Sequence, residues 1–458
     1  MAGTETTMER IHFIAIGGAV MHNLAITLKK KGCEVTGSDD EIYEPAASRL
    51  AEHGLLPEQM GWFPQNILPG TGRIILGMHA RADNPELLRA LDLGLTISSF
   101  PEFLYEQTRK KKRIVVGGSH GKTTTTAMIM HVMKHNDIKF DYMVGSAIEG
   151  YDTMVYLDSD SEIAVFEGDE YLSSAIDRRP KFHLYHPDIA IINGIAWDHM
   201  NVFPTWEGYV DQFRIFSEMI THGGTLAYYE GDTNAAAIAQ AARPDIIKKP
   251  YGIHAYLQNR AGVFAVTRNR TVAVPFFGDH NFQNLSAAYE ACQTAGLTDD
   301  QFYAAIPSFP GTSRRLQKLR DDEHIVVFQD FAHAPSKVKA TIDAVAGAYT
   351  KRNIVAVLEL HTYSSLNEKF IGQYAGTMDS ATKAFVYYNP HALQMKKLPN
   401  LSREEVAAAF RHRDIFVTDN SEELFSAVTN AVNSNSALLL MSSGDFDGAD
   451  LKKITETL

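Results

Sequence analysis

The chain has 458 residues, of which 45% are hydrophobic and 21% are charged. This length and composition predict a globular enzyme of about three domains. The formal net charge of −12 argues against a general nucleic-acid-binding protein, which normally carries a basic face. The sequence has no run of about eighteen uninterrupted apolar residues, and its N-terminus carries Glu5 and Glu9 with no apolar segment behind a basic one. We therefore expect no membrane insertion and no export, and we expect the protein in the cytoplasm.

Cysteine usage points to the same class of protein. The two cysteines, Cys33 and Cys292, lie far apart, each in a segment with apolar periodicity. They support neither a disulfide framework nor a thiolate metal site. We expect both to be small buried apolar residues.

Residues 1–107 have the pattern of a Rossmann-like α/β domain. Gly17 and Gly18 follow the first predicted strand, where small residues let a pyrophosphate approach, and Asp39 follows the second strand, where a carboxylate can bind a ribose. This turn has fewer glycines than a dinucleotide fingerprint, so we expect a nucleoside diphosphate group rather than NAD. The predicted strands are Ile11–Ile16, Glu34–Thr36, Arg73–Gly77 and Leu95–Ser98, and the predicted helix is Met21–Lys31.

A basic run, Arg109–Arg113, marks the next boundary. Runs of like charge are usually solvated, so we expect an exposed linker between domains, with a nucleic-acid-binding patch as the alternative. The second domain is predicted over residues 108–316 and the third over residues 317–458.

A phosphate-binding loop is the most informative motif of the chain. After the predicted strand Arg113–Val116, the sequence reads Gly117-Gly118-Ser119-His120-Gly121-Lys122-Thr123-Thr124 and a helix begins. Backbone N–H groups of such a loop surround phosphate oxygens, the Lys122 ammonium can reach the β- and γ-phosphates, and the Thr123 hydroxyl can bind Mg²⁺. Val116 replaces the first glycine of the usual spacing, but the Gly-x-x-Gly-Lys-Thr core still predicts a nucleoside triphosphate site.

Two further predicted strands, Ile163–Phe166 and Ile189–Asn193, indicate a parallel sheet with crossover helices. Glu167 follows the first of these strands and His199 follows the second, at the edge where ligands of such sheets bind. A carboxylate is a natural Mg²⁺ ligand and a histidine is a weaker one. Taken alone, a histidine at the end of a strand is more often a structural residue, and a glutamate there is more often solvated.

Asn281 and Asn284 lie at the start of the predicted helix Leu285–Thr294, on one helical face, and their amides can read an adenine edge; helix capping is the alternative and explains at most one of them. Arg315 precedes the third domain and Asp330 ends its first strand, where a surface salt bridge is an equal alternative. The predicted strands of this third α/β domain are Ile325–Phe328, Ile354–Leu358, Ala384–Tyr388, Ile415–Val417 and Ala437–Met441, and a helix is predicted from Ser336.

Together these motifs resemble the Mur ligase family. The resemblance rests on the loop Ser119-His-Gly-Lys-Thr-Thr124, Glu167, Asp198-His199, Gly278-Asp-His-Asn-x-x-Asn284, Arg314-Arg315 and Asp330-Phe-Ala-His333-Ala-Pro335, in family order over nearly the whole chain. It implies a three-domain α/β fold with a Rossmann-like N-terminal domain, a central P-loop ATPase domain and a Rossmann-like C-terminal domain. It also implies an ATP-dependent carbon–nitrogen ligase of peptidoglycan metabolism that uses ATP and Mg²⁺ and acts on UDP-N-acetylmuramate.

The resemblance assigns roles to individual residues. It makes Lys122, Glu167 and His199 catalytic, with Thr123, Glu167 and His199 as the Mg²⁺ ligands. The implied ATP contacts are Gly118, Ser119, His120, Gly121, Lys122, Thr123, Thr124, His280, Asn281, Asn284, Arg315 and Asp330. The implied contacts to the UDP substrate are Gly17, Gly18, Ser38, Asp39 and His79, and those on the acceptor side are His333, His361 and Ser364. Phe213 stands about where some members carry a carbamylated lysine, so we do not expect that modification.

Within the family, His120 is similar to the branch that acts on UDP-N-acetylmuramate itself. One member of this branch adds L-alanine and another attaches the recycled tripeptide L-alanyl-γ-D-glutamyl-meso-diaminopimelate. The segment Asp177–Pro187, the stretch Phe331–His333 and the tail Ser443–Gly448 resemble the tripeptide ligase, so we expect the tripeptide as acceptor, with L-alanine as the alternative.

The implied reaction begins when the muramyl carboxylate attacks the γ-phosphorus of ATP, and the amine then displaces phosphate from the acyl phosphate. Positioning and charge neutralisation would provide most of the catalysis. A nicotinamide oxidoreductase would leave Lys122 without a role, and a P-loop regulatory or transport ATPase would not explain Asn281 and Asn284.

Overall fold

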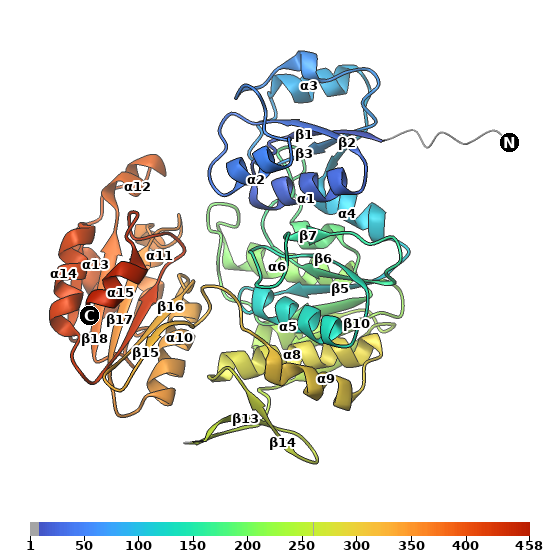
Figure 1. Ribbon diagram of the computed structural model, residues 1–458. Coiled ribbons are helices and arrows are strands. Elements are labelled where there is room, and N and C mark those ends of the chain that lie inside the picture. The colour runs from blue at the N-terminus through green and yellow to red at the C-terminus, as the bar shows by residue number, and fades with distance from the viewer. Residues whose placement is uncertain (1–8, 260) are drawn as a thin grey trace. The chain divides into compact units, whose positions relative to one another are not determined.

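The computed structural model describes residues 9–259 and 261–458, so the predicted lack of an export signal, which concerns Glu5 and its neighbours, lies largely outside the described residues. The chain forms two compact units (Figure 1). The first contains the described residues up to Ile195 with Val210–Tyr251 and Ala287–Ile306, and the second contains Ala196–Tyr209, Gly252–Ser286 and Pro307–Leu458.

The first unit begins with a four-stranded parallel sheet in the order β2-β1-β3-β4. Figure 1 shows α1 and α2 on one side of this sheet and α3 on the other, which is a doubly wound arrangement. The buried side chains of Ile74 and Leu76 pack with Leu87 in one of its cores. The elements are β1 (Arg10–Ile14), α1 (Ala19–Lys30), β2 (Glu34–Ser38), α2 (Ala46–Glu52), β3 (Arg73–Leu76), α3 (Pro85–Asp92), β4 (Ile97–Ser99) and α4 (Phe100–Thr108).

A seven-stranded sheet follows, in the order β11-β10-β9-β5-β8-β6-β7, and it is parallel except for β7. β5 lies between β9 and β8, and its residues from Arg113 onward are buried, as expected for a central parallel strand covered on both faces. The elements are β5 (Lys112–Gly117), α5 (Lys122–His135), β6 (Phe140–Met143), β7 (Val155–Tyr156), β8 (Ile163–Glu167), β9 (Ile189–Ile192), α6 (Trp206–Glu218), β10 (Thr225–Tyr229), α7 (Thr233–Ala241), β11 (Ile247–Tyr251), α8 (Asp279–Ala295) and α9 (Asp299–Ala305).

The second unit contains a small antiparallel sheet, β12-β13-β14, and a six-stranded sheet in the order β15-β16-β20-β17-β18-β19. Hydrophobic cores on both faces of the larger sheet, one around Phe328 and Val338 and the other around Leu424 and Leu440, make it doubly wound. The strands are β12 (Tyr256–Asn259), β13 (Gly262–Val266), β14 (Thr271–Val274), β15 (Gln317–Asp321), β16 (Ile325–Asp330), β17 (Asn353–Leu360), β18 (Lys383–Tyr388), β19 (Ile415–Thr418) and β20 (Ser436–Met441). The helices are α10 (Pro335–Ala348), α11 (Glu368–Ile371), α12 (Pro390–Met395), α13 (Arg403–Phe410), α14 (Ser421–Ala431) and α15 (Leu451–Thr457).

These elements confirm the predicted α/β class with mostly parallel sheets, and two local predictions were wrong. The third domain does not begin with β16, because β15 precedes it and pairs antiparallel to it at the edge of the sheet. The short, charged sequence Gln317–Asp321 has none of the apolar runs by which the other strands were found. The helix predicted from Leu285 begins at Asp279 instead.

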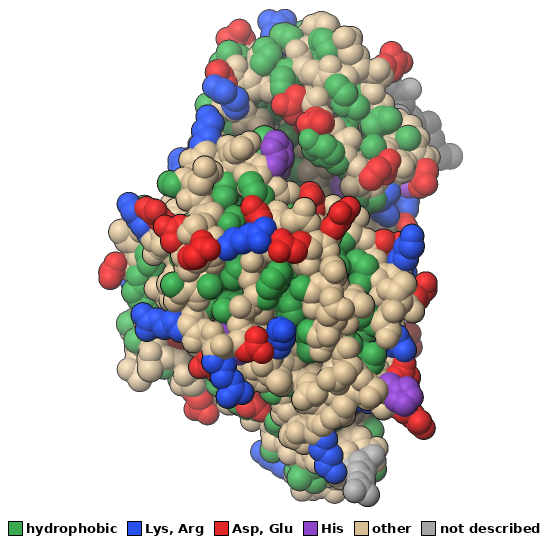
Figure 2. Space-filling view, turned by 90° about the vertical axis from the view of Figure 1, so that its left-hand side faces the viewer, with side chains coloured by type: hydrophobic (Ala, Val, Ile, Leu, Met, Phe, Trp, Pro, Cys, Tyr) green, Lys and Arg blue, Asp and Glu red, His purple; other side chains and the backbone are tan. Residues whose placement is uncertain are grey.

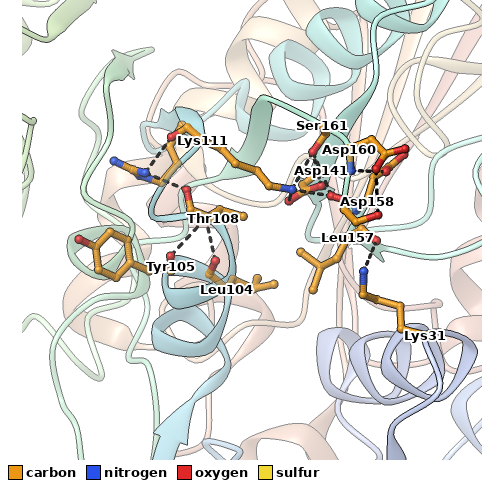
Figure 3. A network of polar contacts seen from close by, with 12 residues as sticks. Lys31, Leu104, Tyr105, Thr108, Lys111, Asp141, Leu157, Asp158, Asp160 and Ser161 are labelled. Carbon is orange, nitrogen blue, oxygen red and sulfur yellow. Dashed lines mark hydrogen bonds and ion pairs between the residues drawn. The ribbon is translucent and has the colours of Figure 1, made fainter. Parts of the chain in front are cut away.

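The basic run before β5 is only partly the exposed linker that its sequence predicts. Lys111 Nζ donates hydrogen bonds to Asp141, at 2.7 Å, and to the Ser161 hydroxyl, at 2.8 Å, and the Asp141 side chain is fully buried (Figure 3). Arg113 is also buried, and it donates to the carbonyl oxygen of Thr108 at the end of α4, at 2.9 Å. Lys111 therefore neutralises the buried Asp141 carboxylate, and Arg113 donates to a backbone carbonyl at the end of α4.

The two cysteines are free, but only one fits its prediction. Cys292 is fully buried in α8, as expected, whereas Cys33 is partly exposed in the connection between α1 and β2. Cys33 lies after the end of α1, so it is not part of the buried apolar face of that helix.

The turn after β1 has a strained backbone residue. Ala15 has a φ of 69°, in the left-handed region that favours glycine. Gly77 follows β3 next to it, and a Cβ built on Gly77 would lie 2.9 Å from the Cβ of Ala15. Glycine at residue 77 therefore provides the space that Ala15 occupies.

None of the described helices is long and apolar enough to cross a membrane. On the face shown in Figure 2, acidic and basic side chains are interspersed.

Candidate nucleotide and acceptor sites

The predicted phosphate loop connects β5 to α5. Gly118 has a φ of 133°, and a Cβ there would lie 2.9 Å from the backbone nitrogen of Asn193. Gly121 has a φ of 75° and directly precedes the first residue of α5. Both positions therefore require glycine, one for close packing and the other for its backbone conformation. The loop leads to the N-terminus of a 14-residue helix, where the helix dipole favours an anion.

Lys122, the first residue of α5, lies inside this loop. Its Nζ donates to the carbonyl oxygen of Gly118, at 2.7 Å, and to Glu170, at 2.6 Å. Burial opposes its positive charge, but the carboxylates of Glu170 and Asp169 outweigh that effect and raise the pKa of Lys122. The ammonium is therefore charged at neutral pH and held where a phosphate loop needs its cation.

Thr123 and Glu167, two of the three predicted Mg²⁺ ligands, lie together. The Thr123 hydroxyl donates to Oε1 of Glu167 at 2.9 Å, and the N–H of Gly145 donates to Oε2 at 2.9 Å. A Cβ on Gly145 would lie 3.1 Å from Oε1 of Glu167, so a larger residue would crowd the carboxylate. Hydroxyl and carboxylate oxygens are the donors that Mg²⁺ prefers.

Asn193 supports the loop from the neighbouring strand. Its N–H donates to the carbonyl oxygen of Gly117, its side chain donates to the Thr125 hydroxyl at 2.9 Å, and it accepts from the Tyr251 hydroxyl at 2.7 Å. Asn193 is fully buried, so it holds the loop and does not contact a ligand.

The turn predicted to bind the UDP substrate has a carboxylate at its centre. The N–H of Gly17 donates to Oδ2 of Asp39 at 2.7 Å, and a Cβ on Gly17 would lie 3.0 Å from that oxygen. Gly18 caps the N-terminus of α1, and His79 lies exposed in the turn after β3. Ser38 is buried and its hydroxyl donates to Glu86, so this hydroxyl already has a partner within the protein.

The predicted adenine contacts lie at the start of α8. Asn281 donates to the carbonyl oxygen of Phe277 at 2.9 Å, and Asn284 is buried. Burial lowers the pKa of His280 and keeps its ring neutral, and its buried Nδ1 has no hydrogen-bond partner among the described residues. A buried polar atom of this kind marks a place where a ligand or water can donate.

Asp330 is not a surface residue, so the alternative of a surface salt bridge does not hold for it. Asp330 is buried and accepts from the backbone N–H groups of Leu316, at 2.6 Å, and Ala332, at 2.7 Å. The guanidinium of Arg315 lies 4.7 Å from the ring centroid of Phe331. Asp330 thus fixes the loop that presents Arg315.

His199 lies in the second unit, after Asp198, with a left-handed φ of 55°. Its N–H donates to Asp198 at 2.8 Å, and Lys337 lies 3.4 Å from the same carboxylate. Burial favours the protonated acid, but Lys337, with His199 and His333, holds the pKa of Asp198 well below its usual range. Asp198 is therefore an anion beside the predicted metal ligand.

The three residues predicted on the acceptor side differ in exposure. Ser364 is buried and accepts from the N–H of Met200 at 3.3 Å. Burial lowers the pKa of His333 to about 3, so its ring is neutral. The side chain of His361 is 43% exposed, and its Nδ1 lies 3.5 Å from a carboxylate oxygen of the buried Glu359.

Sequence reasoning missed several polar residues that organise these sites. Glu170, Glu86 and Glu359 are buried acids, and none was given a role although each accepts or faces a predicted site residue. Only Glu170 had a usable signal, because it lies three residues after Glu167 at the carboxyl end of the same strand.

The chain matches three family models in succession. These are the Mur ligase family catalytic domain over residues 10–112, the Mur ligase middle domain over residues 116–292, and the Mur ligase glutamate ligase domain over residues 314–444. The chain belongs to the Mur ligase family. It is therefore an ATP-dependent ligase that forms amide bonds. The predicted membership of this family is confirmed.

Relatives of this Mur ligase include enzymes for two acceptors. The UDP-N-acetylmuramate–L-alanine ligase of Limosilactobacillus reuteri is 29% identical over 82% of this chain and 84% of the relative. The UDP-N-acetylmuramate–L-alanyl-γ-D-glutamyl-meso-2,6-diaminoheptandioate ligase of Haemophilus influenzae is 27% identical over 97% of this chain and 98% of the relative. L-alanine ligases are the more frequent among relatives of similar identity.

The fold agrees with the family. The crystal structure of a murein peptide ligase from Psychrobacter arcticus matches with a TM-score of 0.66 at 23% identity, covering 98% of both chains. This likeness confirms the predicted multidomain α/β architecture.

The residues of the loop fit ATP with a divalent cation. Gly118 and Gly121 give the loop its left-handed backbone turns, Lys122 supplies a charged ammonium, and the Thr123–Glu167 pair supplies hard oxygen donors. A bound Mg²⁺ would neutralise phosphate charge there.

Proposed function

We propose that this Mur ligase joins UDP-N-acetylmuramate to the tripeptide L-alanyl-γ-D-glutamyl-meso-diaminopimelate and converts ATP to ADP and phosphate, as in peptidoglycan recycling. The proposal includes the domain bounds 1–107, 108–316 and 317–458 and a location in the cytoplasm, where ATP is available. UDP-N-acetylmuramate–L-alanine ligation is the second candidate, because relatives with that activity are the more frequent.

The polar edge of the second unit's large sheet supports the tripeptide. The half-exposed His361 follows β17, and the buried Glu359 accepts hydrogen bonds from the Ser442 hydroxyl and from the N–H of Phe446, at 2.9 Å. The tripeptide carries several carboxylates and a distal amine, which need such polar partners, whereas L-alanine carries one carboxylate and a methyl group. The full-length relative from Haemophilus influenzae adds support from sequence.

In the proposed reaction, an oxygen of the muramyl carboxylate attacks the γ-phosphorus and the bond to ADP breaks. The amino nitrogen of the acceptor then attacks the carbonyl carbon, loses a proton, and phosphate leaves as the amide forms. Lys122 would neutralise the transferring phosphoryl group, and Thr123, Glu167 and His199 would hold the Mg²⁺ that screens it. Gly17, Gly18, Asp39 and His79 would bind the UDP part of the substrate.

The deciding measurement is ADP release with UDP-N-acetylmuramate, ATP and Mg²⁺ in the presence of either acceptor. A site built to hydrogen-bond the tripeptide disfavours an acceptor that leaves its polar groups unpaired by up to roughly 10⁴-fold, so we expect the tripeptide to be far better than L-alanine. The reverse preference would assign the chain to L-alanine ligation, and ATP hydrolysis independent of any acceptor would contradict both candidates.

A further inference from the structure

The most buried carboxylate of the first domain has no role in the chemistry described so far. Glu86, in the first turn of α3, is completely buried. Its Oε1 accepts from the Ser38 hydroxyl at 2.7 Å, from the N–H of Phe63 at 2.9 Å and from the Asn66 side chain at 3.3 Å. Its Oε2 lies 3.4 Å from Nε2 of the equally buried His12.

These contacts hold segments that border the predicted nucleotide turn. Ser38 ends β2 and immediately precedes Asp39, whose side chain accepts a hydrogen bond from the N–H of Gly17. The carbonyl oxygen of Asp39 accepts from the N–H of Gly61 at 2.8 Å, and the two residues form an isolated antiparallel bridge. Glu86 therefore binds both sides of that bridge, through Ser38 on one side and through the segment after Gly61 on the other.

The segment after Gly61 is aromatic and partly exposed. Trp62 and Phe63 are each only partly buried, and Met60 is 41% exposed. Gly61 has a φ of 129°, and a Cβ there would lie 3.1 Å from the ring of Phe63. Aromatic faces stack on nucleobases without demanding a particular hydrogen-bond pattern. The segment thus places aromatic surface next to the carboxylate expected to meet a ribose.

We propose that Glu86 is a positioning residue of the UDP site: it fixes the Gly61–Asn66 segment and Ser38 so that an aromatic platform for the uracil ring and the Asp39 carboxylate for the ribose lie side by side. The inference rests on the proposed function, because it requires that the first domain binds the UDP part of the substrate. Glu86 does not touch the ligand in this account.

The hydrogen bonds of Glu86 suggest two informative substitutions of this residue. Glu86→Ala removes the acceptor of three donors. Glu86→Gln can retain an oxygen at the Oε1 position for those donors and place its amide nitrogen toward Nε2 of His12, which can accept a hydrogen bond. The glutamine variant should therefore restore what the alanine variant loses. Asp92→Ala, at the exposed end of the same helix, is the matched control.

The test is calorimetric titration of the full-length protein with UDP and, separately, with ATP. We expect Glu86→Ala to weaken UDP binding by about 10- to 100-fold, the range for losing hydrogen bonds to a charged group. Glu86→Gln and Asp92→Ala should bind UDP like the wild type, and ATP binding should not change in any variant. A purely structural role would lower the melting temperature of Glu86→Ala and leave its UDP affinity unchanged.

Two outcomes overturn the inference: a folded Glu86→Ala that binds UDP like the wild type, or a Glu86→Gln that is as weak as Glu86→Ala. If Glu86→Ala does not fold, Asn66→Ala and Trp62→Leu take its place, and unchanged UDP affinity in both overturns it equally. A wild type that binds no UDP would defeat the proposed function as well, whereas a wild type that binds UDP confines the failure to Glu86.

Discussion

Nζ of Lys122 lies 2.6 Å from a carboxylate oxygen of Glu170, whose side chain is completely buried. This ion pair holds the ammonium within the phosphate loop before any phosphate is bound. A preformed cation of this kind needs little reorganisation when charge develops on a transferring phosphoryl group.

Lys122→Ala should abolish most of the activity while the protein stays folded. Removing one electrostatic contact at a preorganised site typically lowers turnover by on the order of 10² to 10³. The measurement is ADP release under saturating substrates, with Lys139→Ala, an exposed lysine of the same domain, as the control. Near-normal ADP release by a folded Lys122→Ala would show that the loop does not act on phosphate.

Glu167→Ala should raise the Mg²⁺ concentration needed for half-maximal activity, because it removes the carboxylate that faces Thr123. We expect added Mg²⁺ to restore part of the activity. Glu162→Ala, at the exposed residue that precedes the same strand, should behave like the wild type. If Glu167→Ala instead lowered both the melting temperature and the activity, and added Mg²⁺ had no effect, Glu167 would have a packing role.

His199→Ala should show the same Mg²⁺-dependent defect if this residue is a metal ligand. Its left-handed φ of 55° offers a second reading, since alanine adopts that backbone less readily than glycine does. His199→Gly separates the two: a ligand role predicts that glycine is as inactive as alanine, and a backbone role predicts that glycine restores activity.

The stability of the first domain should depend on pH through Asp39. Burial raises the pKa of Asp39 from its ordinary value of 3.8 to about 6, although the N–H of Gly17 opposes the shift. Between these two values the folded chain binds more protons than the unfolded chain, so the contribution of Asp39 to stability is complete below about pH 4 and is lost as the pH rises through about 6. The melting temperature of Asp39→Asn minus that of the wild type should therefore increase from pH 4 to pH 7. Asp92→Asn, at the exposed end of α3, is the control, and a difference for Asp39→Asn that does not change with pH would contradict the assignment.

Lys111→Ala should lower the melting temperature by several degrees. Breaking a buried ion pair typically costs about 3–5 kcal/mol because the remaining charge stays buried, and the Asp141 carboxylate in Figure 3 is completely buried. Lys110→Ala, an exposed neighbour in the same basic run, should have no such effect. Equal melting temperatures for the two variants would show that Lys111 is as solvated as its sequence suggested.

The contrast between Lys122 and Lys111 shows what the sequence could and could not reveal. Lys122 was found because its partners are neighbours in the chain: the glycines, Thr123 and the preceding strand form one contiguous motif. Lys111 is one of five consecutive cations, and only the fold brings Asp141, 30 residues away, to its ammonium.

The same contrast, between partners that are close in the sequence and partners that only the fold brings together, explains which site residues were predicted. Glu167 and Asp39 were predicted because parallel sheets gather ligands at the carboxyl ends of their strands. Glu86 was not, because its partners Ser38 and Phe63 come from separate segments that meet only in the folded domain. The edge strand β15 escaped prediction because half-exposed charged strands lack an apolar signature.

Ala15 and Gly77 give the nucleotide turn a dependence on a neighbouring strand. A side chain at residue 77 would collide with the Cβ of Ala15 and would also lie 3.1 Å from the carbonyl oxygen of Ile14. Relief would require a shift of residues 14 and 15, which lead directly into Gly17 and Gly18. The backbone of the turn that we propose for the diphosphate is thus constrained from outside, by the absence of a side chain at the residue that follows β3.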